Sequence, residues 1–204
     1  PEIPPGITLS VQKMKRFLNM KSSELTELSR EEFLGAIAGS EGRILVSETI
    51  GTVQPLLSDV TNAEFAASMG ADIILLNMFD VQDPLIRALP EVGKEEVIRE
   101  VKKLTGRPVG INLEPVDEAV IKEQGDPLWG MSAGRYASAE NARLAVRMGV
   151  DLIVLTGNPG NGVNNGAITS SLREIRKEAG NKIALAAGKM HASGVLGEGG
   201  EHII

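Results

Sequence analysis

The feature that most limits the fold of this chain is an internal repeat. The segment NAEFAASMGADIILLN from Asn62 to Asn77 returns as NARLAVRMGVDLIVLT from Asn141 to Thr156, displaced by 79 positions. Each copy has the pattern of a helix that ends at Met-Gly and is followed by an aspartate and a short apolar strand. The displacement corresponds to two βα units of about 40 residues each. The repeat therefore predicts a chain built from equivalent βα units.

The residues between helix and strand have predictable roles in both copies. Gly70 and Gly149 follow the helices and are expected to supply the left-handed turn that ends them. Asp72 and Asp151 precede the strands, and their carboxylates are expected to accept hydrogen bonds from nearby backbone. The asparagine that opens each copy is expected to cap its helix.

Strand-like and helix-like segments alternate through most of the chain. Five short apolar runs predict strands, at residues 43–50, 71–77, 107–115, 150–157 and 182–188. Helical patterns lie between them, at residues 61–69, 93–104, 138–148 and 168–179. Such alternation is typical of a parallel sheet covered by helices. Because the units repeat, the pattern favours a (β/α)8 TIM barrel over a doubly wound open sheet.

The first part of the chain has a different character. We expect a helical extension at residues 1–40, with Ser22 or Ser23 and then Ser29 as helix caps, and a partial barrel domain at residues 41–204. A complete barrel needs eight strands and typically about 250 residues. Five strands predict either a chain that continues beyond Ile204 or a sheet that another chain closes. The first is favoured, because an open half-barrel leaves two unpaired edges.

Composition and charge exclude several classes of function. There is no cysteine, which rules out disulfide scaffolds, zinc–thiolate sites and thiol nucleophiles. The 21 basic and 27 acidic residues are scattered, with a net charge of −6, so no nucleic-acid partner is expected. The chain shows no secretory signal pattern and no apolar stretch long enough for a membrane span. We therefore expect a cytoplasmic protein with no membrane partner.

Polar residues stand at the end of every predicted strand. In a barrel, the active site is built from the C-terminal ends of the strands and the loops that follow them. The polar residues there, strand by strand, are Ser47 and Glu48; Asn77 and Asp80; Asn112 and Glu114; Thr156, Asn158 and Asn161; and Lys189 and His191. We expect these side chains to form one polar ring above an apolar core.

Three carboxylates of this ring, Glu48, Asp80 and Glu114, are candidate ligands for Mg²⁺. Magnesium prefers oxygen ligands and usually takes one or two carboxylates, with water or substrate completing its shell. Three carboxylates that face one cavity repel one another unless a cation or a proton intervenes. The alternative is that some of them cap helices or pair with nearby arginines, namely Arg43, Arg107 and Arg135.

The loop TGNPGNGVNNG, which follows the fourth strand, is rich in glycine and asparagine. Free backbone amides that lead into a helix near Thr169 are suited to phosphate or carboxylate groups. No Walker or dinucleotide-binding fingerprint is present. The expected substrate-binding residues are Asn77, Asn112, Thr156, Gly157, Asn158, Gly160, Asn161 and Gly162. The alternative is a polar loop whose Asn-Gly pairs form left-handed turns.

Lys189, His191 and Glu114 are the candidate catalytic residues. The Lys189 ammonium can clamp an anionic substrate, or it can form an imine with a carbonyl group if it loses its proton. His191 can act as an acid or a base near neutral pH. The alternatives are a lysine that extends to solvent at the rim of the sheet and a hydrogen-bonded structural histidine.

The connection after the third strand is long and carries Trp129 and Tyr136, the latter beside Arg135. Loops of this length in compact domains are commonly functional. We expect this one to wall the pocket or to form an oligomer contact, and we expect a homo-oligomer.

Four stretches carry a resemblance to a known family: SETIGTVQPLLSDVTNAEFAASMGADIILLNMFD, GRPVGINLEP, GVDLIVLTGNPGNGV and ALAAGKMHASGVLGEGGEHI. From about Met14 onward the chain resembles an uncharacterised bacterial TIM-barrel family that is labelled phosphoenolpyruvate phosphonomutase-like. TGNPGNGV and GKMHASG are the most specific stretches. The resemblance implies a complete (β/α)8 barrel with three more βα units beyond Ile204.

The activity expected from this resemblance is that of a magnesium-assisted lyase or isomerase. Its substrate is expected to be a small anionic metabolite, phosphorylated or carboxylated. The chain has GINLEPVDEAV at the third strand, where true mutases carry an aspartate-rich segment, and it has no counterpart of the lyases' K-K-C-G-H. The alternatives are a Schiff-base aldolase that uses Lys189 and a non-catalytic metabolite-binding barrel.

Overall fold

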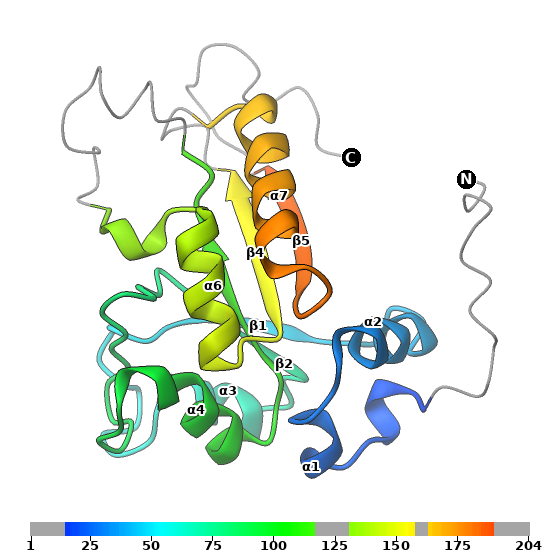
Figure 1. Cartoon of the computed structure of the whole chain (residues 1–204). Coiled ribbons are helices and arrows are strands. Elements are labelled where there is room, and N and C mark those ends of the chain that lie inside the picture. Colours follow the sequence, from blue (N-terminus) through cyan, green and yellow to red (C-terminus); the bar gives the residue numbers. More distant parts are fainter. Residues whose placement is uncertain (1–14, 117–130, 158–162, 190–204) are drawn as a thin grey trace.

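Five parallel strands form the centre of the molecule in this computed structural model, which describes residues 15–116, 131–157 and 163–189. The strands follow one another across the sheet in chain order, and each neighbouring pair is parallel (Figure 1). They are β1 Val46–Ile50, β2 Ile73–Asn77, β3 Val109–Leu113, β4 Leu152–Gly157 and β5 Ala184–Lys189. All five predicted strands are confirmed.

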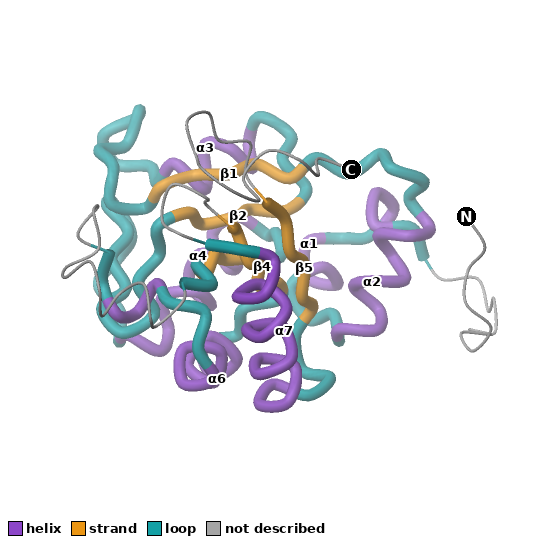
Figure 2. The backbone as a smooth tube through the Cα atoms, turned by 90° about the horizontal axis from the view of Figure 1, so that it is seen from above, coloured by secondary structure: helices purple, strands orange, loops and turns teal. Residues whose placement is uncertain are grey.

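Helices connect the strands, as the alternating pattern predicted. They are α3 Asn62–Ser68, η2 Lys94–Glu96, α4 Val97–Thr105, η3 Ala133–Arg135, α6 Ala139–Met148 and α7 Asn165–Ala179. Helix α7 begins four residues before the predicted start near Thr169, because Asn164 caps it by accepting a hydrogen bond from Ala167 N at 2.8 Å. The four longer helices, α3, α4, α6 and α7, pack in sequence around one side of the sheet (Figure 2).

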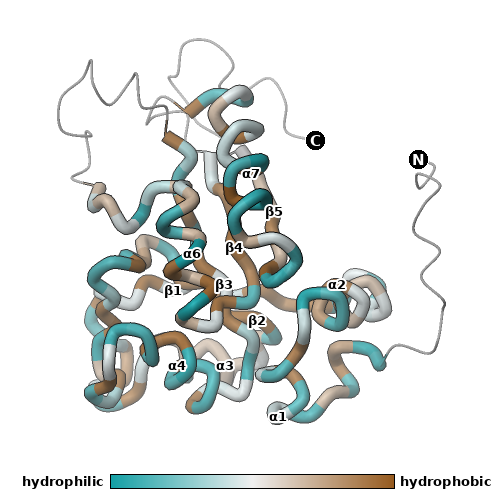
Figure 3. The backbone as a smooth tube through the Cα atoms, viewed as in Figure 1, coloured by the Kyte–Doolittle hydropathy of each residue, from teal (hydrophilic) through white to brown (hydrophobic). Residues whose placement is uncertain are grey.

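The strand register divides the sheet into two faces. On the face toward α3, α4, α6 and α7, called the outer face here, Ile74, Leu76, Ile111, Ile153 and Leu155 are buried against the helices. The alternate residues lie on the inner face. Figure 3 shows the result, with hydrophobic strands at the centre and more hydrophilic helices around them. Burial of the outer face is the main source of stability for this arrangement.

Three short helices before the sheet cover part of the inner face. They are η1 Phe17–Asn19, α1 Ser22–Leu25 and α2 Arg30–Gly39. Phe17 and Phe33 meet edge to face, with ring centroids 6.3 Å apart, and belong to one buried cluster with Ile73 and Ala184 of the sheet. The predicted N-terminal helices therefore pack directly on the strands and close the amino-terminal part of the inner face.

Ser29 caps α2 as predicted, since its side chain accepts a hydrogen bond from Glu32 N and Glu32 reaches back to Ser29 N. The predicted cap at Ser22 or Ser23 is wrong. Helix α1 begins after Lys21, whose backbone amide donates to the Glu24 carboxylate at 2.7 Å.

The junctions of the internal repeat agree with the sequence. Gly70 and Gly149 have φ of 100° and 85°, in the left-handed region. The helix caps differ from the prediction: Thr61 and Ser138 cap α3 and α6, whereas the expected asparagines lie inside the helices. Asn141 is buried and donates to two loop carbonyls, so it holds the loop before α6 rather than the helix end.

A five-stranded parallel sheet with helices on one face is a partial TIM-barrel-like arrangement. Within the described residues, β1 and β5 are the edges, and each pairs with a single neighbouring strand. Of the helices in the described segments, none is both long enough and apolar enough to span a bilayer.

Candidate functional site

Two asparagines and a threonine meet near the carboxyl ends of the central strands. Leu76 pairs with Ile111 in the register, so the residues that follow them, Asn77 and Asn112, lie side by side on the inner face. The Asn112 side-chain amide donates from Nδ2 to Thr156 Oγ1 of β4 at 2.7 Å. Thr156 thus joins the same cluster from the next strand.

Asn112 leaves one polar atom unsatisfied. Its side chain is only 7% exposed, and Oδ1 is buried without a hydrogen-bond partner among the described residues. A buried acceptor without a donor costs about 1–3 kcal/mol, and native structures contain few of them. The described residues therefore leave this acceptor of Asn112 without a donor.

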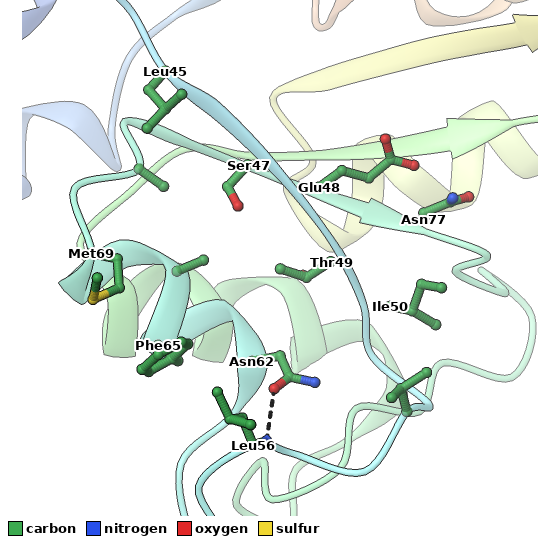
Figure 4. Close-up of a pocket in the computed structure, with 13 residues that line it drawn as sticks. Leu45, Ser47, Glu48, Thr49, Ile50, Leu56, Asn62, Phe65, Met69 and Asn77 are labelled. Carbon is green, nitrogen blue, oxygen red and sulfur yellow. Dashed lines mark hydrogen bonds between the residues drawn. The ribbon is translucent and has the colours of Figure 1, made fainter. Parts of the chain in front are cut away.

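Glu48 lies on the same face, one level nearer the amino ends of the strands. The register aligns it with Leu75, Gly110 and Leu152. Figure 4 shows Glu48 and Asn77 directed to one side of β1, while Thr49 points toward α3 on the other. Glu48 is exposed to solvent, so its carboxylate is available to a ligand.

The floor beneath these polar groups is apolar and closely packed. A side chain at Gly110 would place its Cβ 3.1 Å from both Leu152 O and Leu75 Cδ1, so glycine is required for this packing. Leu152 and Ala184 continue the floor into the cluster formed with the N-terminal helices. Beside the polar groups, Gly188 of β5 faces open space. The inner face is therefore closed below by apolar side chains, and the polar groups lie above this floor.

The structure brings together four residues of the predicted polar ring, namely Glu48, Asn77, Asn112 and Thr156, and places others elsewhere. Ser47 lies on the outer face, in the wall of a cavity between β1 and α3. Gly157 is buried, and a Cβ there would lie 2.7 Å from Ile168 Cδ1. Glycine at this position therefore allows α7 to pack closely, with or without a ligand nearby.

Glu114 has its own partner outside this cluster. Its carboxylate accepts a hydrogen bond from Arg135 Nη2 at 2.6 Å, and each side chain is only 14% exposed. This pairing is the alternative that the sequence left open for the carboxylates.

The Asp80 carboxylate also has hydrogen-bond partners, which lie in the loops. It accepts hydrogen bonds from the amides of Gln82 and Asp83 at 2.8 and 3.0 Å. Burial acts to raise the pKa of Asp80, but hydrogen bonds from Ser132 and from these amides, with the charge of Arg135, lower it overall.

The three predicted magnesium ligands, Glu48, Asp80 and Glu114, do not fit a shared site. Two of them are committed to loop contacts, and the described part of the chain contains no cluster of three Asp, Glu or His side chains able to hold a metal ion. Magnesium stays a prediction, and these residues do not provide a set of ligands for it.

Several predicted site residues lie outside the described part of the chain. They are Asn158, Gly160, Asn161, Gly162 and His191, together with Trp129 and the side chain of Lys189. The Lys189 backbone ends β5 and is paired in register with Gly157. Tyr136 is described, and its hydroxyl donates to Met131 O at 3.4 Å within its own loop.

A cavity of about 740 Å³ lies beside β1, and the sequence analysis did not predict it (Figure 4). Phe65 of α3, Met69 just after it, Ser47 and Thr49 line it, as do Glu48 and Asn77 of the polar cluster. Leu56, which also lines it, is 72% exposed. The signal that could have indicated it is the apolar pair Leu56 and Leu57, which stands in a loop rather than in a strand or helix.

Fold and site together define an α/β protein with a TIM-barrel-like sheet and a polar cluster at the strand ends. Residues 18–204 match the family described as Domain of unknown function (DUF7916), and the chain belongs to that family. No protein of curated function matches it in sequence.

Solved structures with a similar course of the chain include three glycoside hydrolases. A GH27 β-L-arabinopyranosidase from Geobacillus stearothermophilus, solved with arabinose, is 15% identical, with a TM-score of 0.42 and coverage of 74% of this chain and 50% of that one. An α-N-acetylgalactosaminidase-type protein from Bacillus halodurans is 13% identical, with a TM-score of 0.41 and coverage of 74% of this chain and 50% of that one. A maltogenic α-amylase from Thermotoga neapolitana is 13% identical, with a TM-score of 0.35 and coverage of 73% of this chain and 46% of that one. The chain thus spans about half the length of these structures.

These comparisons correct the family and the activity expected from the sequence. The matching family is described as a domain of unknown function, not as phosphonomutase-like. The prediction of a phosphoenolpyruvate phosphonomutase-like family is wrong, and so is the prediction of a lyase or isomerase. Short apolar strands and Met-Gly-Xaa-Asp junctions suit the βα architecture in general, so they do not distinguish one such family from another.

Proposed function

We propose that the inner face of the sheet binds a small polar ligand at the carboxyl ends of β2, β3 and β4. The observation that carries this proposal is the buried Oδ1 of Asn112, which has no donor in the described protein. Asn77 and Thr156 stand beside it, and Glu48 lies one level below. Binding sites typically combine an apolar lining with a few convergent polar groups, and this face has that composition.

We propose further that the sheet is part of a closed (β/α)8 barrel. The parallel order of the strands, the helices on one face and the open edges at β1 and β5 support it. In a closed barrel, the strand ends that carry Asn77 and Asn112 converge on one pocket. The N-terminal helices then form the lower seal of that pocket, through Phe17 and Phe33.

The anionic ligand expected from the sequence depended mainly on the loop at residues 157–162. Most of that loop lies outside the described residues. The polar groups that are described are amides, a hydroxyl and a carboxylate. The proposed function therefore specifies a polar ligand and does not require a phosphate.

The test is a thermal-shift screen of the protein against small metabolites at about 10 mM each, including monosaccharides, polyols, sugar phosphates and carboxylic acids. A ligand present at 100 times its Kd stabilises the folded state by about 2.7 kcal/mol. We expect at least one compound to raise the melting temperature of the wild type, and the Asn112→Leu variant to lose that response.

Ser23→Ala is the control, because Ser23 is exposed on α1 and belongs neither to the polar cluster nor to the lining of the cavity beside β1. It should keep the full response. Asn112→Leu removes an unsatisfied acceptor but also the hydrogen bond to Thr156 Oγ1, so the free variant should lose no more than about 1 kcal/mol of stability. A screen without any stabilising compound, or a response that survives in Asn112→Leu, would refute the proposal.

A further inference from the structure

The hydrogen-bonding groups of the inner face form a set that one kind of functional group can satisfy. Asn112 offers the buried, unsatisfied acceptor Oδ1. Asn77 uses Oδ1 to accept from Met78 N at 2.7 Å, and its Nδ2 has no partner within the described segments, so it offers a donor. Thr156 accepts from Asn112 and keeps its own proton to donate. A hydroxyl group, which donates one hydrogen bond and accepts others, matches all three.

Charge on this face disfavours an anion. Among the described residues of the strands, Glu48 is the charged side chain of the inner face, and it is exposed there. Its carboxylate repels a phosphate or carboxylate ligand, and it accepts hydrogen bonds from hydroxyl donors. Arg135, which follows β3 in the chain, is already paired with Glu114.

The residues aligned with the two asparagines across the sheet also offer apolar surface. The register aligns Ile50, Asn77, Asn112, Val154 and Ala186 across all five strands. Two amides are therefore flanked by apolar side chains, with a small residue on β5 beside them. Adjacent strands lie about 4.8 Å apart, so neighbouring amides can reach two hydroxyl groups of one ring while the apolar neighbours contact its C–H face.

We infer that the ligand of this site is a neutral polyhydroxylated compound, a sugar or a cyclic polyol, recognised by Asn77, Asn112 and Thr156 with Glu48 as an acceptor. This inference rests on the proposed function, which places the ligand on the inner face. It adds the chemical class, and it assigns to Glu48 a role in selecting hydroxyl donors over anions.

Isothermal titration calorimetry provides the test, with D-glucose, D-mannose and myo-inositol as neutral probes and D-glucose 6-phosphate, inorganic phosphate and pyruvate as anionic ones. At least one neutral probe should bind, with an affinity that changes little between about 50 and 500 mM NaCl, because no charge attraction is involved. Its phosphorylated counterpart should bind more weakly.

Glu48→Gln distinguishes the role of the carboxylate. A hydrogen bond to a charged group contributes more than one to a neutral group, so we expect this variant to bind the neutral probe about 10-fold more weakly and to discriminate less against the anionic probes. Glu31→Gln, an exposed change on α2, is the matched control and should leave both affinities unchanged.

The outcomes separate the two levels of the proposal. If the anionic probes bind through Asn112 and the neutral ones do not, the inference about ligand class is overturned while the proposed function stands. If Glu48→Gln leaves the affinity and the discrimination unchanged, the role of Glu48 is overturned. If none of the probes and none of the screened metabolites binds, the proposed function fails as well.

Discussion

Asp151, just before β4, accepts a hydrogen bond from the backbone amide of Val109 at the start of β3, with 2.8 Å between Val109 N and Oδ2. The other copy of the repeat makes the same contact: Asp72 Oδ2 accepts from Leu45 N, just before β1, at 2.8 Å. Each aspartate therefore ties the start of its own strand to the start of the preceding one. A carboxylate at this position helps to set the register between neighbouring parallel strands.

The two copies differ in burial, which predicts different costs for the same substitution. Asp151 also pairs with Lys102 Nζ at 2.9 Å, and the two side chains are 9% and 12% exposed. Burial raises the pKa of Asp151, against the opposing effect of Lys102. Asp151→Asn leaves the Lys102 charge buried without its partner, so we expect a loss of about 3 kcal/mol in the free energy of unfolding. Asp72→Asn should cost about 1 kcal/mol. Urea unfolding of both variants measures the difference, and equal losses would contradict this account.

Gly134 is predicted to be intolerant of any side chain. A Cβ at this position would lie 1.7 Å from Asp80 Oδ1 and 2.8 Å from Gln82 N. Gly134→Ala must displace the Asp80 carboxylate from its hydrogen bonds, and we expect it to lower the free energy of unfolding by about 2 kcal/mol or more. Gly93→Ala is the control, since nothing lies within 4 Å of its Cβ position and its φ is −63°. That variant should be neutral or slightly more stable. Thermal melts of both proteins decide the matter.

The Glu114–Arg135 pair is predicted to be strongly coupled. Both side chains are 14% exposed, whereas those of the Lys94–Asp83 pair, whose Nζ–Oδ1 distance is 2.8 Å, are 66% and 81% exposed. A double-mutant cycle with Glu114→Gln and Arg135→Met should give a coupling energy of about 2 kcal/mol. The same cycle at Lys94 and Asp83 should give less than about 0.5 kcal/mol. Coupling energies of similar size at the two pairs would show that burial does not govern them.

The lowered pKa of Asp80 predicts how the stability of the protein changes at acidic pH. Its pKa is lower in the folded protein than its ordinary value of 3.8, so the folded state binds fewer protons than the unfolded chain as pH falls. The contribution of Asp80 to stability is therefore complete above its ordinary pKa and is lost as pH falls toward the lower folded value. Between about pH 5 and pH 2.5, Asp80→Asn should lose less stability than the wild type, and above about pH 6 the two proteins should have parallel pH profiles. Urea titrations at each pH provide the measurement, and an unchanged acid slope would be the opposite result.

Local features of the sequence determined the secondary structure. The repeated Met-Gly-Xaa-Asp junctions and the apolar runs predicted all five strands, because these patterns depend on contacts between residues close together in the chain. Helix starts were less accurate. At α3 and α6 we predicted that an asparagine caps the helix, but the capping residues are Thr61 and Ser138. Ser, Thr and Asn cap helices almost equally well, so neighbouring candidates cannot be separated by residue type alone.

The candidate site depended on tertiary structure. The sequence placed Glu48, Asp80, Asn112 and Glu114 at strand ends, but it could not show which of them already had partners. Arg135 reaches Glu114 across 21 positions of the chain, and this contact gives that carboxylate a partner. Asn112 looked like one polar residue among many until its burial and its unsatisfied Oδ1 were known. The sequence by itself determined the alternation of strands and helices, whereas the pairing of distant charges and the exposure of each polar atom depend on how the elements pack, which no local pattern encodes.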